Sequence, residues 1–210
     1  MRKMRVTLEV FLSAMLAMQV AQAGAQNPSP MTKDLSEVLV KRGEIVIAGH
    51  STPYLIRHLP VSSFPSLPNA VQDELKRRNC TIPQTYEAHR PENVVHANLE
   101  GRGGTDWAVL CAAQGTVSLL VFFGGSPQTP AELASAPETE RLEAHDASGV
   151  LGFNWGIDPG SPRQVAEAQT GLTPRPPILD HDALADEIVE HKTIYHFYAK
   201  GAWTLVKQPD

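Results

Sequence analysis

The stretch from Asn93 to Phe123 (NVVHANLEGRGGTDWAVLCAAQGTVSLLVFF) constrains the fold more than any other part of the chain. Three short apolar runs, rich in β-branched and aromatic residues, are separated by glycines. Runs of this length bounded by glycine are typical of strands joined in hairpins. The stretch therefore predicts three strands, with a Gly-rich turn at 101–104 and a tight turn at Gln114-Gly115.

Most other segments predict further strands, and helices are few and short. Asn69 is positioned to cap a helix that has acidic residues early and basic residues late, as the helix dipole favours. The expected helices cover 69–79, 129–134 and 161–168, and a terminal hairpin is expected from 193–198 and 202–206. Because no βαβ alternation is present, we expect an α+β fold with an antiparallel sheet, as a single domain over residues 35–210.

The beginning of the chain has the pattern of an export signal. Arg2, Lys3 and Arg5 precede an apolar run at 10–20, and Ala21-Gln22-Ala23 matches a small-x-small cleavage site. Residues 1–23 are therefore predicted to be a signal peptide, followed by a flexible lead-in at 24–34. The expected location is periplasmic or secreted.

The charge and the hydropathy of the chain argue against nucleic acid and the membrane interior as binding partners. The net charge is −5, so the chain lacks the basic footprint of a nucleic-acid-binding protein. After the predicted signal peptide, no apolar run reaches the roughly 18 residues that a spanning helix needs. We therefore expect neither nucleic-acid binding nor stable membrane insertion after signal cleavage.

The predicted export bears on whether the two cysteines form a disulfide. Cys80 and Cys111 are the only cysteines, and an oxidising compartment favours their pairing as a disulfide. Two buried free thiols are the alternative. Redox catalysis is not favoured, because no Cys-x-x-Cys pair is present.

The Gly-rich turn partly matches a calcium loop. Asn98, Glu100 and Asp106 lie at the spacing of oxygen ligands around a central glycine. Arg102, however, places a cation where a carboxylate ligand is needed. A hairpin turn made tight by glycines is the simpler interpretation, and a calcium site is the alternative.

Histidines and acidic residues mix in the second half of the chain and raise a zinc hypothesis. His181-Asp182 follows Pro176-Pro177 on an expected loop, and His145, His191 and His196 are the other histidines of this half. Neither an H-E-x-x-H nor an H-x-x-x-H arrangement is present. His181 and Asp182 are the strongest zinc candidates, and scattered, non-ligating histidines are the simpler interpretation.

Aromatic residues suggest a binding surface near the C-terminus. Tyr195, Phe197 and Trp203 lie on the expected terminal hairpin. An exposed aromatic strip on this sheet would bind a protein or a glycan. Burial of these rings in the core is the alternative.

Several of these segments also resemble a known group of proteins. The stretch NVVHANLEGRGGTDWAVLC resembles the unit NVI-x-G-x-F-x-x-x-G-x-x-D-W-A-V-L-C of small secreted bacterial proteins of unknown function, and is distantly similar to a single FG-GAP-type propeller motif. Cys80-Thr81-Ile82-Pro83-Gln84 and the ending HDALADEIVEHKTIYHFYAKGAWTLV resemble other parts of the same family. The resemblance implies an exported single domain with Cys80 paired to Cys111, and it carries no catalytic assignment. One such motif cannot form a propeller.

Functional motifs are otherwise missing from the sequence. Neither a G-x-S-x-G nucleophile elbow nor a phosphate loop is present. We therefore expect a non-catalytic envelope protein, without a cofactor, that binds a protein or a cell-wall component. The alternative is a metal-dependent hydrolase that uses the second-half histidines and carboxylates.

Overall fold

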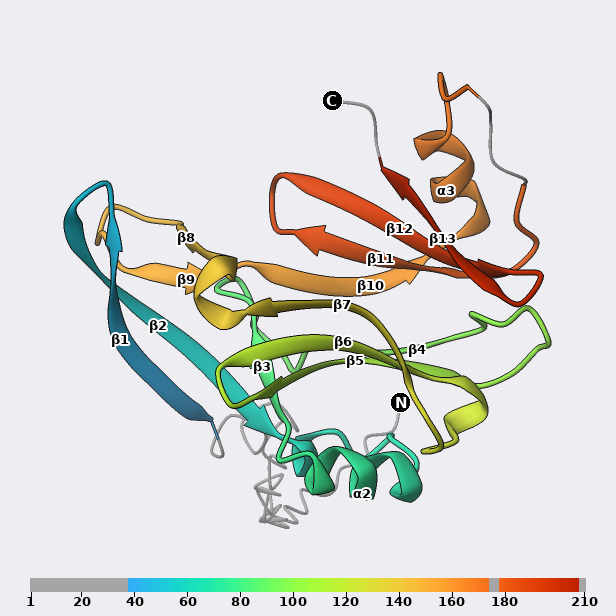
Figure 1. Ribbon diagram of the computed structural model, residues 1–210, viewed down its shortest axis with the longest axis horizontal. Coiled ribbons are helices and arrows are strands. Elements are labelled where there is room, and N and C mark those ends of the chain that lie inside the picture. Colours follow the sequence, from blue (N-terminus) through green and yellow to red (C-terminus); the bar gives the residue numbers. More distant parts are fainter. Residues whose placement is uncertain (1–37, 174–177, 208–210) are drawn as a thin grey trace, which may run out of the picture.

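The computed structural model describes residues 38–173 and 178–207 (Figure 1). The predicted signal peptide (1–23) and lead-in (24–34) lie outside the described residues, as do the first residues of the predicted domain.

The larger of two sheets has nine strands and is mostly antiparallel. Its central path runs β7-β6-β5-β3-β2-β9-β8, with β1 paired to β2 and β4 paired to β5. The pairing of β2 with β9 is parallel, which makes the sheet mixed. The strands are β1 (Leu39–Ile47), β2 (His50–Pro60), β3 (Thr81–Gln84), β4 (Val94–Ala97), β5 (Asp106–Ala113), β6 (Thr116–Phe122), β7 (Ala131–Pro137), β8 (Leu142–Ala144) and β9 (Leu151–Phe153).

The smaller sheet is an antiparallel meander of four strands in chain order. It contains β10 (Trp155–Gly160), β11 (Ala183–Ile188), β12 (Lys192–Ala199) and β13 (Ala202–Lys207). Only Asn154 separates β9 of the larger sheet from β10 of the smaller one. The chain therefore passes from one sheet to the other at this residue.

The two sheets pack face to face, and each carries one short α-helix on its outer side (Figure 1). Helix α2 (Asn69–Arg77) buries Val71 and Leu75 against the larger sheet. Helix α3 (Pro162–Ala168) packs against the smaller sheet. The layers contain three apolar clusters: one between the sheets, one under α2 and one under α3. Short 3₁₀ turns occur at η2 (Val61–Ser63), η3 (Phe123–Gly125) and η4 (Glu138–Arg141).

The three central strands and the terminal hairpin confirm the sequence prediction. The tight turn between β5 and β6 has φ of 52° at Gln114 and 83° at Gly115. A two-residue turn with both φ values positive matches the right-handed twist of the strands it connects. Helix α3 also agrees, because the Ser161 side chain and Gln164 form a reciprocal capping box.

The helix predicted over 129–134 is wrong, and so is the cap predicted for α2, although α2 itself is present as predicted. Residues 131–134 belong to β7, because Ala131 to Pro137 pair with the open side of β6. Helix α2 lacks the expected Asn69 cap: Pro68 occupies the cap position and no side chain caps this end. The fold is therefore dominated by sheets, with two short α-helices in the described chain, and is not a balanced α+β arrangement.

Cys80 and Cys111 form a disulfide with their Cα atoms 5.0 Å apart, as predicted. Cys80 follows α2 and Cys111 lies in β5, so the bond ties the helix to the sheet that it covers. A disulfide is compatible with an extracellular or periplasmic protein. No helix within residues 38–173 and 178–207 is long and apolar enough to cross a membrane.

Candidate functional site

Asp106, a predicted calcium ligand, closes the Gly-rich loop. Its side chain is fully buried, and its two oxygens accept backbone N–H bonds from Glu100 at 2.8 Å and Gly124 at 2.7 Å. A buried carboxylate needs such donors. Both Asp106 oxygens are thus already hydrogen-bonded within the protein.

The structure brings the calcium and zinc candidates into one place. The Asn98 backbone N–H donates to the Asp182 carboxylate at 3.0 Å. The Asn98 side-chain oxygen in turn accepts from the Gly103 backbone N–H at 3.1 Å. His181 bonds the Tyr198 carbonyl and the Asp180 carboxylate, both at 2.8 Å. These contacts join the 98–106 loop to the start of β11, and in the described residues no three His, Cys, Asp or Glu converge to hold a metal.

The remaining second-half histidines lie in separate pairs. His145 stacks on Tyr86, and His191 bonds Glu143 at 2.5 Å. His196 bonds Asp186 at 2.9 Å in the core, where Asp186 also accepts from the Trp155 indole at 2.6 Å. Each of these histidines has its own partner, and the hydrolase alternative stays a prediction.

The predicted aromatic strip is not on the surface. Tyr195 and Phe197 are 6% and 1% exposed and belong to the core under α3. Trp203 is half-buried and packs with Phe123 and Tyr198. Side chains alternate along β12, so its aromatic residues fill both faces of the sheet. Tyr195 and Phe197 therefore belong to the core and not to an exposed strip, whereas Trp203 is partly exposed.

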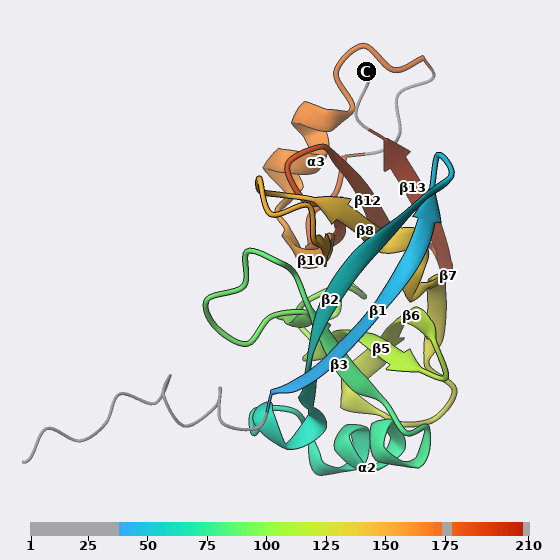
Figure 2. The same cartoon turned by 90° about the vertical axis from the view of Figure 1, so that its left-hand side faces the viewer.

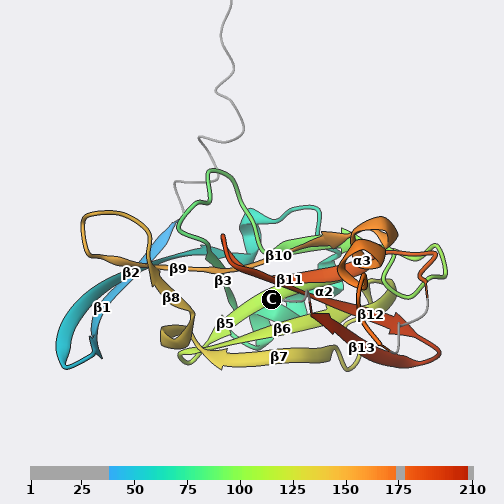
Figure 3. The same cartoon turned by 90° about the horizontal axis from the view of Figure 1, so that it is seen from above.

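Strand β1 is the most exposed element of the sheets. It pairs with β2 alone within the described chain, so its other edge is open. Six large apolar side chains are exposed in the described residues, and four of them belong to β1: Leu39 (54%), Val40 (44%), Val46 (75%) and Ile47 (46%). The β1–β2 hairpin extends beyond the body of the molecule (Figure 3).

The local sequence explains why this hairpin forms. Ala48 and Gly49, with φ of 50° and 84°, make a tight turn that pairs Ile47 with His50. Tyr54 lies opposite Gly43, and a Cβ on Gly43 would lie only 2.5 Å from the Tyr54 hydroxyl. The Tyr54 ring thus covers the glycine in mid-strand. The two strands lie side by side: β1 runs from the α2 end toward the α3 end, and β2 returns antiparallel to it (Figure 2).

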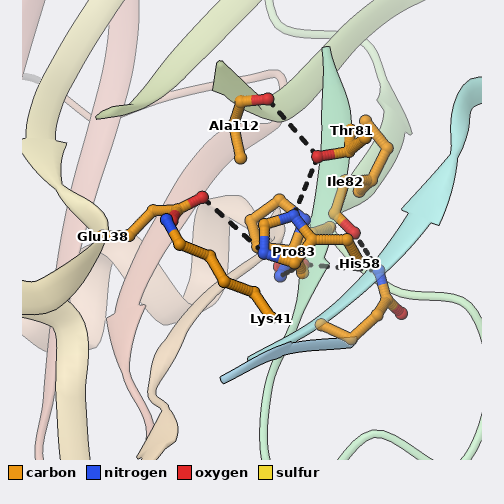
Figure 4. Close-up of polar contacts among 9 residues, drawn as sticks. Lys41, His58, Thr81, Ile82, Pro83, Ala112 and Glu138 are labelled. Atoms are coloured by element: carbon orange, nitrogen blue, oxygen red, sulfur yellow. Dashed lines mark hydrogen bonds and ion pairs between the residues drawn. The ribbon is translucent and has the colours of Figure 1, made fainter. Parts of the chain in front are cut away.

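Behind β1 lies a polar cluster of Lys41, His58 and Glu138, in which the side chains of His58 and Glu138 are buried (Figure 4). Lys41 reaches from β1 to form an ion pair with Glu138, whose side chain is only 4% exposed. His58, in β2, places Nε2 3.6 Å from the same carboxylate. Its Nδ1 bonds the Thr81 hydroxyl at 2.8 Å. The Lys41–Glu138 pair therefore ties the exposed strand to the interior.

Burial determines the protonation of His58. Removal from water lowers the pKa of this imidazole, and the nearby Lys41 charge lowers it further, while the Glu138 carboxylate opposes both effects. The net shift is downward, so the ring is neutral at neutral pH. The Thr81 hydroxyl that bonds Nδ1 also donates a hydrogen bond to the Ala112 carbonyl at 3.4 Å.

A cavity of about 310 Å³ adjoins this cluster. Leu39 and Val40 line it from β1, and Lys41, His58 and Glu138 contribute its polar side. Its lining thus combines exposed apolar side chains of the open edge with the polar cluster behind them.

A larger, acidic cavity of about 510 Å³ lies elsewhere, beside β10 and β11. Burial raises the pKa of Asp158, and burial together with the Asp158 charge raises the pKa of Glu187. None of the six exposed large apolar side chains of the described chain lines this cavity. The open edge of β1 is therefore the stronger candidate site.

No family model, no curated protein and no solved structure matches this chain. The resemblance to small secreted bacterial proteins remains a proposal based on the quoted motifs. The candidate site therefore depends on the geometry of the chain itself.

Sequence reasoning missed this site for identifiable reasons. The central charges of LVKRGEIVI divide the strand into two short apolar runs, so the sequence does not mark it as one long strand. Lys41, His58 and Glu138 belong to no motif and are far apart in the chain, with a sequence separation of 97 between Lys41 and Glu138. The Ala48-Gly49 turn was the available signal for the hairpin.

Proposed function

We propose that this protein is an exported, non-catalytic binding protein that pairs the open edge of β1 with an extended segment of a partner protein. The observation that carries the proposal is the nine-residue edge strand with four exposed large apolar side chains. Export is supported by the signal pattern at residues 1–23 and by the disulfide.

An open strand edge supplies binding energy through its backbone. Unpaired N–H and C=O groups along β1 accept a further strand, and side chains on alternate positions supply selectivity. Proteins commonly protect such edges by shortness, charged side chains, proline or bulges. β1 is long and regular and contains no proline, its apolar residues lie at both ends, and Lys41 in its charged centre is paired with Glu138.

Other edges of the sheets are less suited to a partner strand. β8 has three residues, β10 contains Pro159, and β7 ends in Pro137. β13 has one strongly exposed large apolar residue, Leu205, at 54%. β1 therefore offers the longest apolar edge in the described chain.

The polar cluster holds the edge strand β1 in a fixed position. Lys41 is anchored to Glu138, so β1 is held at its N-terminal half by more than its pairing with β2. A pre-ordered strand loses less entropy when it binds. This anchoring suits a docking edge.

The test uses nine-residue peptides selected from a displayed library against the purified mature protein. Peptide affinity is then measured by fluorescence anisotropy for the wild type, for Val46→Lys and for Leu205→Lys. A lysine on an edge strand opposes pairing with another strand. We expect affinity to fall at least about tenfold, ~1.4 kcal/mol, in Val46→Lys.

The Leu205→Lys variant is the matched control, because Leu205 is an exposed apolar residue on another edge strand. Its affinity for the peptide should equal that of the wild type. Peptides that bind Val46→Lys as tightly as the wild type would contradict the proposal, and so would a library that yields no binder at protein concentrations at which the chain is a monomer.

A further inference from the structure

The charges of β1 form a self-complementary pattern about Gly43. Leu39–Ile47 reads LVKRGEIVI, with Arg42 and Glu44 on either side of the glycine. When two such strands align antiparallel with Gly43 opposite Gly43, Arg42 of each lies opposite Glu44 of the other. Val40 then faces Val46, and Leu39 faces Ile47.

Symmetry selects this register. Two copies that pair antiparallel edge to edge are related by a two-fold axis normal to the sheet, so a side chain on one face lies on the same face in both copies. Because side chains alternate between the faces along a strand, an odd-numbered residue can lie opposite only an odd-numbered one, and an even-numbered residue only an even-numbered one. The two neighbouring permitted registers place Arg42 opposite Arg42 or Glu44 opposite Glu44. Like charges directly opposite each other destabilise a strand pair, whereas opposite charges stabilise it.

The structure leaves the required groups exposed. Arg42 and Glu44 are both exposed. Glu44 accepts one hydrogen bond, from the Ser51 hydroxyl at 2.6 Å, which leaves its second oxygen for a cation. At the axis Gly43 has no side chain, and Tyr54 of the same copy covers one side of it.

We propose that the partner strand is β1 of a second copy of this chain, paired antiparallel about Gly43. The inference rests on the proposed function, since it names the partner of the same edge. The larger sheets of the two copies then form one continuous sheet. Ile47 of the second copy then lies opposite Leu39, which lines the 310 Å³ cavity beside the polar cluster. Each copy therefore borders this cavity of the other copy.

Charge reversal tests the pairing. Arg42→Glu places two like-charged pairs at the interface, and Glu44→Arg does the same with the opposite sign. A mixture of the two variants restores both attractive pairs, because one copy carries two acidic residues and the other two basic residues. Each variant alone should dimerise about tenfold more weakly than the wild type, and the mixture should recover wild-type affinity.

The measurement is sedimentation velocity of the mature protein, at concentrations from micromolar to millimolar, with circular dichroism to confirm that each variant is folded. The proposal predicts a wild-type dimer, weakened in each variant and restored in the mixture. A wild type that is monomeric throughout overturns it. A dimer that is indifferent to both reversals also overturns it, because its interface then lies elsewhere.

The result is distinguishable from failure of the proposed function. A monomeric wild type whose peptide binding is still weakened by Val46→Lys would show that the edge accepts a foreign strand and not its own. A monomer without peptide binding would remove both proposals.

Discussion

At the scale of single residues, His58 shows how its surroundings determine the charge of a side chain. Burial lowers its pKa, so the folded protein binds this proton less readily than the unfolded chain, whose histidine pKa is about 6.5. The stability that neutral His58 contributes is therefore complete above that pH. It is lost as the pH falls from there through the lowered folded pKa.

The expected result for His58→Gln is a smaller loss of unfolding free energy between pH 7 and pH 5 than in the wild type. Each unit of pKa difference between the folded and unfolded states corresponds to about 1.4 kcal/mol. Urea denaturation at both pH values measures this difference. His89→Gln, at an exposed histidine, serves as the control, and equal losses in wild type and His58→Gln would contradict the prediction.

At the scale of elements, the disulfide joins pieces that local sequence already forms. Helix α2 and strand β5 each follow from their own patterns, and the bond between Cys80 and Cys111 closes a loop with a sequence separation of 31. A cross-link of this length restricts the unfolded chain by roughly 3–4 kcal/mol.

Replacing both cysteines by alanine should therefore lower the unfolding free energy by roughly 3–4 kcal/mol, because the unfolded chain regains that entropy. Denaturant unfolding of the double variant measures the change. The wild type unfolded with reductant present should lose a similar amount. A loss below about 1 kcal/mol would show that the cross-link contributes little.

The error over 129–134 also belongs to this scale. The residues Thr-Pro-Ala-Glu-Leu-Ala favour a helix by local propensity. Pairing with β6 decided otherwise, with Leu119 opposite Ala134 and Val121 opposite Ala131. Helical propensity is a weak preference that a neighbouring open strand overrides.

At the scale of the whole molecule, Asn93 links the two sheets. It is 2% exposed, and its amide donates to the Pro83 carbonyl of the larger sheet at 2.7 Å and to the Trp155 carbonyl of the smaller sheet at 3.2 Å. Its side-chain oxygen accepts from the Ile157 backbone at 3.0 Å. One side chain thus satisfies polar groups of both layers.

Asn93→Ala should lower the unfolding free energy by roughly 3 kcal/mol or more, since it leaves buried backbone groups unpaired and places alanine at φ of 68°. Asn93→Gly separates the two effects, because glycine adopts this φ freely but makes none of the bonds. It should recover about 1 kcal/mol. Denaturant unfolding tests both, and an alanine variant as stable as the wild type would contradict this role.

The sequence by itself determined the features that depend on neighbouring residues. Hairpin turns at Gln114-Gly115 and Lys200-Gly201, the three central strands and the capped helix α3 follow from local steric preferences and side-chain periodicity. With only two cysteines, export left one possible disulfide.

Only the tertiary structure decided how these elements share their edges and faces. It left β1 open on one side, buried Tyr195 and Phe197 under α3, and brought Lys41, His58 and Glu138 together. It also placed both oxygens of Asp106 in hydrogen bonds with backbone N–H groups. Such outcomes depend on contacts between residues far apart in the chain. The local preferences of a segment do not determine which distant strand, helix or charged residue packs against it.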